Sequence, residues 1–453
     1  MKVIILSGGK GTRLWPLSRE NFPKQFIRLF SKNSLFQETV KRALKLTSED
    51  EILVITGEKY EWLIRSELEE IGTENVQVIV EPVGRNTAPA IALGIKKLLS
   101  LETPPSETIL VLPSDHLIKE VDKFVEAVKK GEKVAKEGYI VLFGEKPSYP
   151  ETGYGYIRIA DNIIESVYDV ERFEEKPDYE KAKEYVSDGK HLWNCGIFLF
   201  TLERIVKDYT QLMPGIRLNL KYQDFKEAFE EFPNISFDYA ILEKTKKLAV
   251  VKMEVGWSDV GSWKAVYDNM AKDVNGNVIV GDVEILQTQN SFLLSQGKNL
   301  IACVGLEDFV IIGTEDATLI IRKEDSQKVR EIVKDLERKG DERAIEHITM
   351  FTPFGSITKL ENGERYKIRK IVVKKGKEIP LRMHHHRTVH FIILKGTAEV
   401  KVGNTQKYYH ENESFFIPKS VPYKIINVGK IPLEMIEVQS GEYLGEDDVE
   451  TLE

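Results

Sequence analysis

The chain has 453 residues, enough for about two to four domains of ordinary size. It is 42% hydrophobic and 30% charged, which suits a globular protein with a sizeable core and excludes wholesale disorder. The formal net charge of −8 argues against a nucleic-acid partner, but a local basic site for a phosphorylated small molecule remains compatible with it.

No segment of the chain resembles a membrane span or a leader. No apolar run approaches the ~18–20 residues that a span requires, and Met1 opens directly into a buried-strand pattern. Two cysteines, Cys195 and Cys303, are too few for a disulfide framework. We therefore expect a cytoplasmic protein that has no membrane contact.

In the first 250 residues, short runs rich in β-branched residues alternate with longer amphipathic segments. This alternation predicts βαβ units around a mainly parallel, Rossmann-like sheet, whose ligands bind beyond the carboxyl ends of the strands. The predicted strands are Val3–Leu6, Glu51–Thr56, Val76–Val80, Thr108–Leu112 and Tyr139–Phe143. The predicted helices are Ser34–Leu46, Glu61–Ile71, Pro89–Leu99 and Lys123–Glu137.

From about Asn275 the pattern becomes β-rich. Short apolar stretches recur at intervals of roughly ten residues, which indicates either a short solenoid, such as a left-handed β-helix, or a sandwich. The stretches are Val278–Val280, Phe292–Leu294, Leu300–Val304, Phe309–Ile312 and Thr318–Ile321. A charged helix over Glu324–Lys339 follows, and we interpret it as a connector.

The segment that begins near Met350 is also all-β by pattern. Its predicted strands are Tyr366–Val373, His390–Leu394, Ala398–Val402, Ser414–Ile417 and Leu433–Val438. We expect three domains: residues 1–273, residues 274–345 with the connector helix, and residues 346–453.

A glycine-rich turn directly follows the first predicted strand. Gly8, Gly9 and Gly11 let the backbone approach a ligand and direct N–H groups at phosphate oxygens, and Arg13 adds a charged fork suited to phosphate. The turn is not a P-loop, because it lacks the Gly-Lys-Ser/Thr ending. By itself it could equally be a tight turn between a strand and a helix.

The turn, together with Trp15-Pro16-Leu17-Ser18-Arg19, resembles the sugar nucleotidyltransferases, and specifically the mannose-1-phosphate guanylyltransferase branch. Later motifs are similar to those of that branch in order and spacing. They are Arg85-Asn86-Thr87-Ala88-Pro89-Ala90, Pro113-Ser114-Asp115-His116, Gly153-Tyr154-Gly155-Tyr156, Glu174-Glu175-Lys176-Pro177, Trp193-Asn194-Cys195-Gly196 and Trp257-Ser258-Asp259-Val260-Gly261.

This resemblance implies transfer of GMP from GTP to mannose 1-phosphate, which yields GDP-mannose and pyrophosphate with Mg²⁺ as cofactor. The implied catalytic residues are Arg13, Lys24, Asp115, Lys176 and Asp259, of which Asp115 and Asp259 bind the metal. The implied nucleotide-binding residues are Leu6, Ser7, Gly8, Gly9, Gly11, Thr12, Arg13, Lys24, Asn86, Thr87, Ala88, Pro113 and Asp115. The implied sugar-phosphate-binding residues are Gly155, Glu175, Lys176, Asn194 and Asp259.

The chemistry of this reaction agrees with these residue types. The sugar-phosphate oxygen is already a nucleophile, so catalysis requires alignment and charge stabilisation rather than a covalent intermediate. Carboxylate oxygens such as those of Asp115 and Asp259 are the hard ligands that Mg²⁺ prefers. Cys195 is accordingly expected to be a small buried residue and not a nucleophile.

From about Met350 the chain resembles the cupin-type phosphomannose isomerase domain that is fused to such guanylyltransferases in bacteria. The matching stretches are Met383-His384-His385-His386-Arg387, Lys395-Gly396-Thr397-Ala398, Glu411-Asn412-Glu413-Ser414 and Glu437-Val438-Gln439-Ser440-Gly441. The expected architecture is therefore an α/β, GT-A-like nucleotidyltransferase domain, a small β-rich module and a C-terminal all-β cupin barrel.

The departures from the isomerase pattern fall on its metal site. Where the isomerases carry Gln, His, Glu and His, this chain carries Arg382, His384, Val389 and Tyr423. Arginine and valine offer no lone pair to a metal, and a phenol is a poor ligand at neutral pH. We therefore predict that the metal site and the isomerase activity are lost.

Several alternatives remain open from the sequence. His384, His386 and His390 would lie on one face of a continuous strand and could bind Zn²⁺ or Ni²⁺. The chain could be bifunctional, with a working isomerase, or could use another nucleoside triphosphate with another hexose 1-phosphate. The barrel could also be a non-catalytic binding or dimerisation module, and we expect a homodimer.

Overall fold

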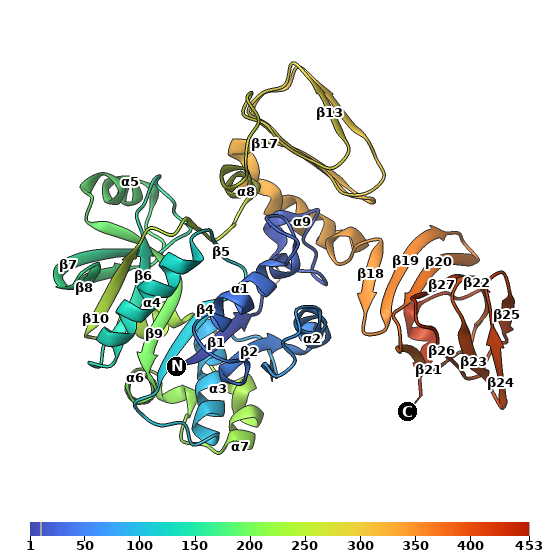
Figure 1. The fold of residues 1–453 in the computed structure, drawn as a ribbon, viewed down its shortest axis with the longest axis horizontal. Helices are drawn as coiled ribbons and strands as arrows, with labels where there is room; N and C mark the ends of the chain where they lie inside the picture. Colours follow the sequence, from blue (N-terminus) through green and yellow to red (C-terminus); the bar gives the residue numbers. More distant parts are fainter. Residues whose placement is uncertain (10, 453) are drawn as a thin grey trace. The chain divides into compact units, whose positions relative to one another are not determined.

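The computed structural model describes residues 1–9 and 11–452, so that Lys10 of the glycine-rich turn and Glu453 lie outside the described residues. The chain forms two compact units, Met1–Gly340 and Asp341–Glu453. The first unit contains both the α/β region and the β-rich module, and the second contains the all-β region (Figure 1).

The first unit is built on a nine-stranded sheet with the order β3-β2-β1-β4-β9-β6-β10-β8-β7. Its strands are β1 (Lys2–Ser7), β2 (Ile52–Gly57), β3 (Gln77–Glu81), β4 (Thr108–Pro113), β6 (Ile140–Glu145), β7 (Tyr156–Ile164), β8 (Val167–Glu174), β9 (His191–Thr201) and β10 (Leu248–Met253). The predicted parallel arrangement holds for β1 to β4, but β9 runs antiparallel to both β4 and β6. The sheet is therefore mixed, and the long buried strand β9 joins its two halves.

Helices cover both faces of this sheet. The side chains of β1 alternate between the faces, so that they contribute to both cores. Val3 and Ile5 join the core beneath α1 (Leu35–Leu44), α2 (Glu61–Glu70) and α4 (Val121–Ala135). Ile4 joins the opposite core, beneath α3 (Thr87–Ser100), α6 (Leu202–Leu212) and α7 (Tyr222–Glu227). The remaining helices of the sheet region are α5 (Tyr179–Asp188) and α8 (Trp263–Asn269).

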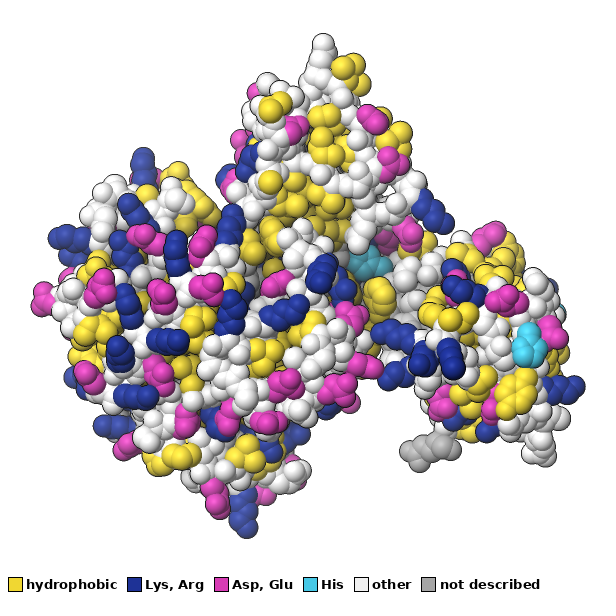
Figure 2. Space-filling model, in the orientation of Figure 1, with side chains coloured by type: hydrophobic (Ala, Val, Ile, Leu, Met, Phe, Trp, Pro, Cys, Tyr) yellow, Lys and Arg dark blue, Asp and Glu magenta, His cyan; other side chains and the backbone are white. Residues whose placement is uncertain are grey.

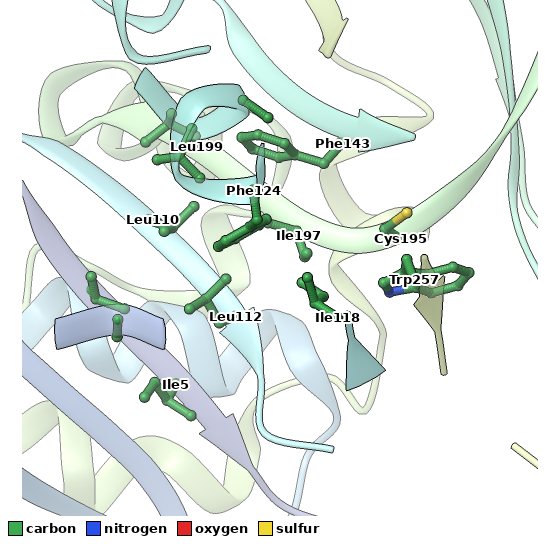
Figure 3. Packing of buried hydrophobic residues seen from close by; sticks show 14 of the residues in the cluster. Ile5, Leu110, Leu112, Ile118, Phe124, Phe143, Cys195, Ile197, Leu199 and Trp257 are labelled. Carbon is green, nitrogen blue, oxygen red and sulfur yellow. The ribbon is translucent and has the colours of Figure 1, made fainter. Parts of the chain in front are cut away.

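Figure 3 shows the first of these cores, where Phe124 of α4 packs among side chains of β4, β6 and β9. The Phe124 and Phe143 rings lie 6.3 Å apart between centroids. Cys195 lies in the same cluster and is fully buried, and burial raises the pKa of its thiol well above the usual value. This is the environment of a packing residue rather than of a nucleophile, as expected.

The β-rich module is a β-helix in which alternate strands, from successive coils, stack in register. Its strands are β12 (Val278–Val280), β13 (Val283–Leu286), β14 (Phe292–Ser295), β15 (Ile301–Val304), β16 (Phe309–Gly313) and β17 (Thr318–Arg322). Strands β12, β14 and β16 form one parallel ladder, and β13 pairs with β15 in a second. The solenoid expectation is therefore confirmed, while β13 was not among the predicted stretches.

A helical segment follows the β-helix, comprising the 3₁₀ turn η8 (Lys323–Lys328) and the helix α9 (Val329–Arg338). Val329 and Val333 are buried, and α9 contacts η1 (Thr12–Leu14), the short helical turn that follows the glycine-rich loop. The interpretation of this helix as a connector was therefore incomplete, because it packs against the glycine-rich region (Figure 1).

The second unit consists of two antiparallel sheets of six and five strands packed around one core. Its strands are β18 (Thr349–Thr352), β19 (Gly355–Asn362), β20 (Tyr366–Val373), β21 (Glu378–His384), β22 (Arg387–Lys395), β23 (Ala398–Val402), β24 (Thr405–Tyr409), β25 (Ser414–Ile417), β26 (Tyr423–Asn427), β27 (Leu433–Gly441) and β28 (Val449–Thr451). Along β22, Val389, Phe391 and Ile393 point inward and are buried. The architecture is the expected cupin-like barrel.

On the face shown in Figure 2, cationic and anionic side chains are interspersed over the first unit.

Two short strands, β5 (Leu117–Ile118) and β11 (Trp257–Ser258), pair antiparallel outside the main sheet. Among the described residues, no helix is both long enough and apolar enough to cross a membrane.

Candidate active site

The glycine-rich turn rests directly on the segment that carries Lys24. Gly9 and Gly11 have φ values of 95° and 54°, in the left-handed region that favours glycine. A Cβ on Gly11 would lie 2.6 Å from the Lys24 nitrogen and 2.8 Å from its Cβ. Glycine at this position therefore allows the turn to pack against Lys24, which begins the 3₁₀ turn η2 (Lys24–Phe26).

Lys24 contacts both of the residues that were predicted to bind metal. Its Nζ lies 2.7 Å from Asp115 Oδ2, just beyond β4, and it donates a hydrogen bond to the backbone carbonyl of Asp259, just beyond β11. Burial acts to raise the pKa of Asp115, but the charge and the hydrogen bond of Lys24 outweigh it, so this pKa lies below its usual value. The Asp115 carboxyl is consequently ionised at neutral pH and able to bind a cation.

His116 lies beside Asp115 in a defined tautomer. Trp257 Nε1 donates to His116 Nδ1 over 3.1 Å, and because an indole N–H can only donate, the imidazole proton resides on Nε2. That nitrogen lies 3.7 Å from Asp115 Oδ1. Burial lowers the pKa of His116, which keeps the ring neutral. The 3.7 Å separation exceeds a hydrogen bond, so His116 is a neutral neighbour of Asp115.

The Asp259 side chain is held by two donors. Its Oδ1 accepts hydrogen bonds from the Tyr154 hydroxyl at 2.5 Å and from the Gly261 N–H at 2.9 Å. Burial and the Asp259 charge raise the pKa of Tyr154 far above its usual value, so this hydroxyl remains a donor. Tyr154 belongs to a predicted motif, but the sequence did not identify its contact with Asp259.

These carboxylates fit a divalent cation that takes its other ligands from phosphate. The Asp115 carboxylate and the Asp259 backbone carbonyl, from separate loops, meet at one ammonium, and Mg²⁺ commonly binds through one or two carboxylates plus substrate phosphates. Within residues 1–9 and 11–452, no group of three or more His, Cys, Asp or Glu side chains is placed to hold a metal.

The predicted sugar-phosphate residues lie together. Lys176 Nζ is 2.5 Å from Glu175 Oε1, and the Asn194 N–H donates to the Gly155 carbonyl over 2.8 Å. A Cβ on Gly155 would lie 2.5 Å from Glu175 Oε2, so the Glu175 carboxylate closely approaches the backbone there. Lys176 has a φ of 49°, a strained value for lysine, and its N–H donates to the Tyr154 carbonyl. Tyr154 thus links this cluster to Asp259.

Asp238 also belongs to the sugar-phosphate cluster, although it was not predicted. Its Oδ1 accepts from Asn194 Nδ2 at 2.9 Å, and burial together with the nearby Glu175 charge raises its pKa to about 6. Asp238 begins a π-helical turn, Asp238–Leu242. No motif surrounds it in the sequence, so only the packing of that turn brings it to the site.

Several predicted nucleotide-binding groups are already hydrogen-bonded within the protein. The Leu6 carbonyl accepts from the Ser114 N–H, and the Ser7 carbonyl accepts from Thr56 Oγ1. Thr87 Oγ1 accepts from the Phe237 N–H, and Ala88 is fully buried. The exposed members of the set are Gly8, Gly9 and Asn86. Thr12 and Arg13 lie in η1 and Pro113 ends β4, so they border the same loops.

A hollow in the first unit connects these elements with the β-helix region. It is lined by Arg13, Tyr149, Glu151, Thr152, Gly153, Tyr154, Asp259, Gly261, Ser262, Ala265, Gln327 and Arg330. Gln327 belongs to η8 and Arg330 to α9. Neither was predicted, because their sequence neighbours form only a charged amphipathic helix.

In the barrel, three of the four residues at the metal-site positions meet. Tyr423 OH accepts from Arg382 Nε at 2.8 Å and lies 2.9 Å from His384 Nε2. Val389 is buried in the same hydrophobic core. Burial and the charges of Arg382 and Arg387 lower the pKa of His384 to about 4.

The alternative of a three-histidine metal site is wrong. Strand β21 ends at His384 and β22 begins at Arg387, so the chain turns between the predicted ligands. His384 is buried, His386 Nδ1 lies 2.7 Å from Asp448 Oδ1, and His390 is exposed with its ring 6.3 Å from that of Phe416. The expected site required one continuous strand from His384 to His390, and the turn interrupts that strand.

Three family models match successive parts of the chain. Residues 2–276 match "Nucleotidyl transferase", residues 281–336 match "MannoseP isomerase/GMP-like beta-helix domain" and residues 339–453 match "Mannose-6-phosphate isomerase C-terminal".

Similar proteins include mannose-1-phosphate guanylyltransferase 2 of Escherichia coli O157:H7, which is 41% identical over 98% of this chain and 96% of its own. The alginate biosynthesis protein AlgA of Pseudomonas aeruginosa is 40% identical over 99% and 96% of the two chains. A solved structure described as mannose-1-phosphate geranyltransferase from Thermus thermophilus is 31% identical, with a TM-score of 0.68, and covers 74% of this chain and 99% of its own.

Proposed function

Because the chain belongs to the bacterial mannose-1-phosphate guanylyltransferases, which are nucleotidyl transferases, we propose that it transfers GMP from GTP to mannose 1-phosphate with Mg²⁺. The products are GDP-mannose and pyrophosphate. The observation that carries the proposal is that Lys24 joins the loops of Asp115 and Asp259 beside the glycine-rich turn. This arrangement brings one cation, the Asp115 carboxylate and the loop that carries Asp259 together at the edge of the sheet where nucleotides bind.

The side chains act by aligning and neutralising phosphates. Asp115 and Asp259 would hold Mg²⁺, which supplies positive charge to the phosphates when it is bound. Lys24 and Arg13 neutralise charge on the triphosphate and on the departing pyrophosphate. No general base is needed because the attacking oxygen is already anionic.

The second cluster suits the sugar phosphate. Lys176 would bind the phosphate, and Glu175 and Asn194 would bind sugar hydroxyls across the close approach at Gly155. We assign Asp238 to the same task, since it lies against Asn194. On the nucleotide side, Gly8, Gly9 and Asn86 present exposed backbone and amide groups to the base and the phosphates.

The test is a pyrophosphate-release assay that crosses GTP, UTP, dTTP and ATP with mannose 1-phosphate and glucose 1-phosphate. GTP with mannose 1-phosphate should give the highest kcat/KM, and turnover should require Mg²⁺. Preference for another pair would replace this proposal with a different hexose-1-phosphate nucleotidyltransferase.

We further propose that the barrel lacks isomerase activity. The Arg382 guanidinium lies among Tyr423, His384 and the buried Glu437, with Nη2 3.5 Å from Glu437 Oε1. A permanent cation at this position opposes a metal ion electrostatically. The protein should therefore not interconvert mannose 6-phosphate and fructose 6-phosphate, even with added Zn²⁺, Mn²⁺ or Co²⁺. Metal-dependent conversion would instead establish a bifunctional enzyme.

The barrel then serves binding or dimerisation, and we propose a homodimer. Light scattering should give twice the chain mass for the full protein. Light scattering of a chain that ends at Gly340, the boundary of the first unit, shows whether the second unit is needed for the doubled mass. This shortened chain should retain transferase activity. We place the enzyme in the cytoplasm, the compartment that two unpaired buried cysteines favour.

A further inference from the structure

Two arginines from distant parts of the chain line the hollow described above. Arg13 belongs to η1 near the N-terminus, and Arg330 belongs to α9, beyond the β-helix. Asp259 and Tyr154 line the same hollow, and Gln327 lies one helical turn before Arg330. The hollow is therefore shared by the proposed transferase site and the helix that follows the β-helix.

Packing fixes α9 in this position. Val329 and Val333 are buried on the face of the helix that contacts η1. The β-helix is itself attached to the sheet region, because buried Arg19 pairs with Asp316 at 2.8 Å. A second attachment comes from α8, where the Trp263 ring lies 5.8 Å from that of Phe292. Arg330 is thus presented from a fixed element rather than from a loose loop.

Two guanidiniums, Arg13 and Arg330, and two carboxylates, Glu151 and Asp259, line the hollow, and the carboxylates accept hydrogen bonds from Gly153, Tyr154 and Gly261. Within the part of the chain that the structure describes, neither Arg13 nor Arg330 forms an ion pair with a carboxylate. Burial and the neighbouring Arg13 charge lower the pKa of Arg330. Two guanidiniums that face one space repel each other, and a bound anion would relieve that repulsion.

We propose that Arg330 and Arg13 together bind the two terminal phosphates of the nucleoside triphosphate and the pyrophosphate product. Arg13 follows the glycine-rich turn on the nucleotide side, while Lys176 already serves the sugar phosphate. Two guanidinium forks suit a diphosphate better than a single phosphate group. Gln327 can add an amide donor. This inference rests on the proposed function and deepens it, since it makes α9 part of the substrate site.

The test compares Arg330→Ala and Arg330→Lys with Arg338→Ala. Arg338 is a matched control because it lies on the same helix with 77% of its side chain exposed. Calorimetric titration of each full-length protein with inorganic pyrophosphate and Mg²⁺ should show about 10-fold to 100-fold weaker binding for Arg330→Ala. Arg330→Lys should restore part of the affinity, and Arg338→Ala should bind normally.

Steady-state kinetics separate the two phosphate sources. In Arg330→Ala, KM should rise for pyrophosphate in the reverse reaction and for the nucleoside triphosphate in the forward reaction, while KM for the sugar 1-phosphate stays unchanged. A rise confined to the sugar 1-phosphate, or wild-type pyrophosphate affinity in a variant with unchanged Tm, would overturn the proposal.

Failure of this inference is distinguishable from failure of the proposed function. The pyrophosphate titration involves no base and no sugar, and the kinetics use whichever triphosphate the wild-type protein prefers. A preference for UTP would refute the guanylyltransferase proposal and leave the Arg330 result standing. Normal pyrophosphate binding by Arg330→Ala would refute the role of Arg330 and leave the base preference untouched.

Discussion

At the residue scale, the site depends on one ammonium group between two acidic loops. Lys24 is 6% exposed, and its Nζ contacts both the Asp115 carboxylate and the Asp259 backbone. A buried cation needs such partners, since an unpaired one would carry a large desolvation penalty. The same pairing keeps the pKa of Asp115 below its usual value, as the proposed metal site requires.

Replacing Asp115 by Asn should abolish turnover while the fold is preserved. The change removes a negative charge from the proposed metal site and keeps the side-chain shape, so kcat should fall by about 100-fold or more. Pyrophosphate release and Tm are measured together, with exposed Asp122→Asn as the control. A near-normal rate would remove Asp115 from the metal site.

Glu145, at the end of β6, should make stability depend on pH. Burial raises its pKa from 4.5 to about 7, so the folded protein holds this proton more tightly than the unfolded chain does. Stability should therefore fall as pH rises from about 4.5 to about 7, and remain reduced above that range.

Glu145→Gln removes this titration. The variant should resemble the wild type at pH 4.5 and should exceed it by about 1 to 3 kcal/mol in free energy of unfolding at pH 8. Denaturant titrations at both pH values measure the difference, with exposed Glu126→Gln as the control. Equal stabilities at pH 8 would contradict the raised pKa.

At the element scale, turns and helices bring the functional groups together. The glycine-rich turn lies against η2, and α9 lies against η1. Neither contact is visible in the periodicity of the elements themselves. Each depends on where a short segment docks after the sheet has formed.

Gly11→Ala should disrupt the docking of the glycine-rich turn. The new methyl group would lie 2.6 Å from the Lys24 nitrogen, at a φ of 54° that disfavours alanine. We expect a loss of about 1 to 3 kcal/mol in free energy of unfolding and a larger proportional loss of kcat/KM. Gly8→Ala, which meets no atom within 4 Å, is the control for stability. Equal stability losses in the two variants would argue against the close approach at Gly11.

At the scale of the whole molecule, the chain consists of two units with separate cores. Buried Arg387 anchors the second unit, with Nε 2.8 Å from Asp448 Oδ2 and Nη1 2.7 Å from Gln439 Oε1. Burial acts to raise the pKa of Asp448, but its bonds to His386 and Arg387 lower it to about 2. This carboxylate therefore stabilises the unit above about pH 4, and the contribution is lost as pH falls through about 2.

Asp448→Ala should destabilise the second unit by about 3 to 5 kcal/mol, because it leaves the buried Arg387 cation without its carboxylate. Calorimetry should show one transition moving to lower temperature, and transferase activity should survive at temperatures below that transition. Asp447→Ala, at a neighbouring exposed carboxylate, is the control. A simultaneous loss of both units would show that they do not unfold independently.

The sequence by itself determined strands β1 to β4 and β6 and helices α1 to α4 of the first unit, the β-helix and barrel expectations, and Lys24, Asp115 and Asp259 as candidates for one site. These follow from local periodicity and from residues clustered in short motifs, and both are visible along the chain. The tertiary structure decided the antiparallel course of β9 and the turn that separates His384 from His390. It also brought Asp238 and Arg330 to the site. The physical reason is that strand pairing and helix docking depend on contacts between segments far apart in the chain, which no local pattern records.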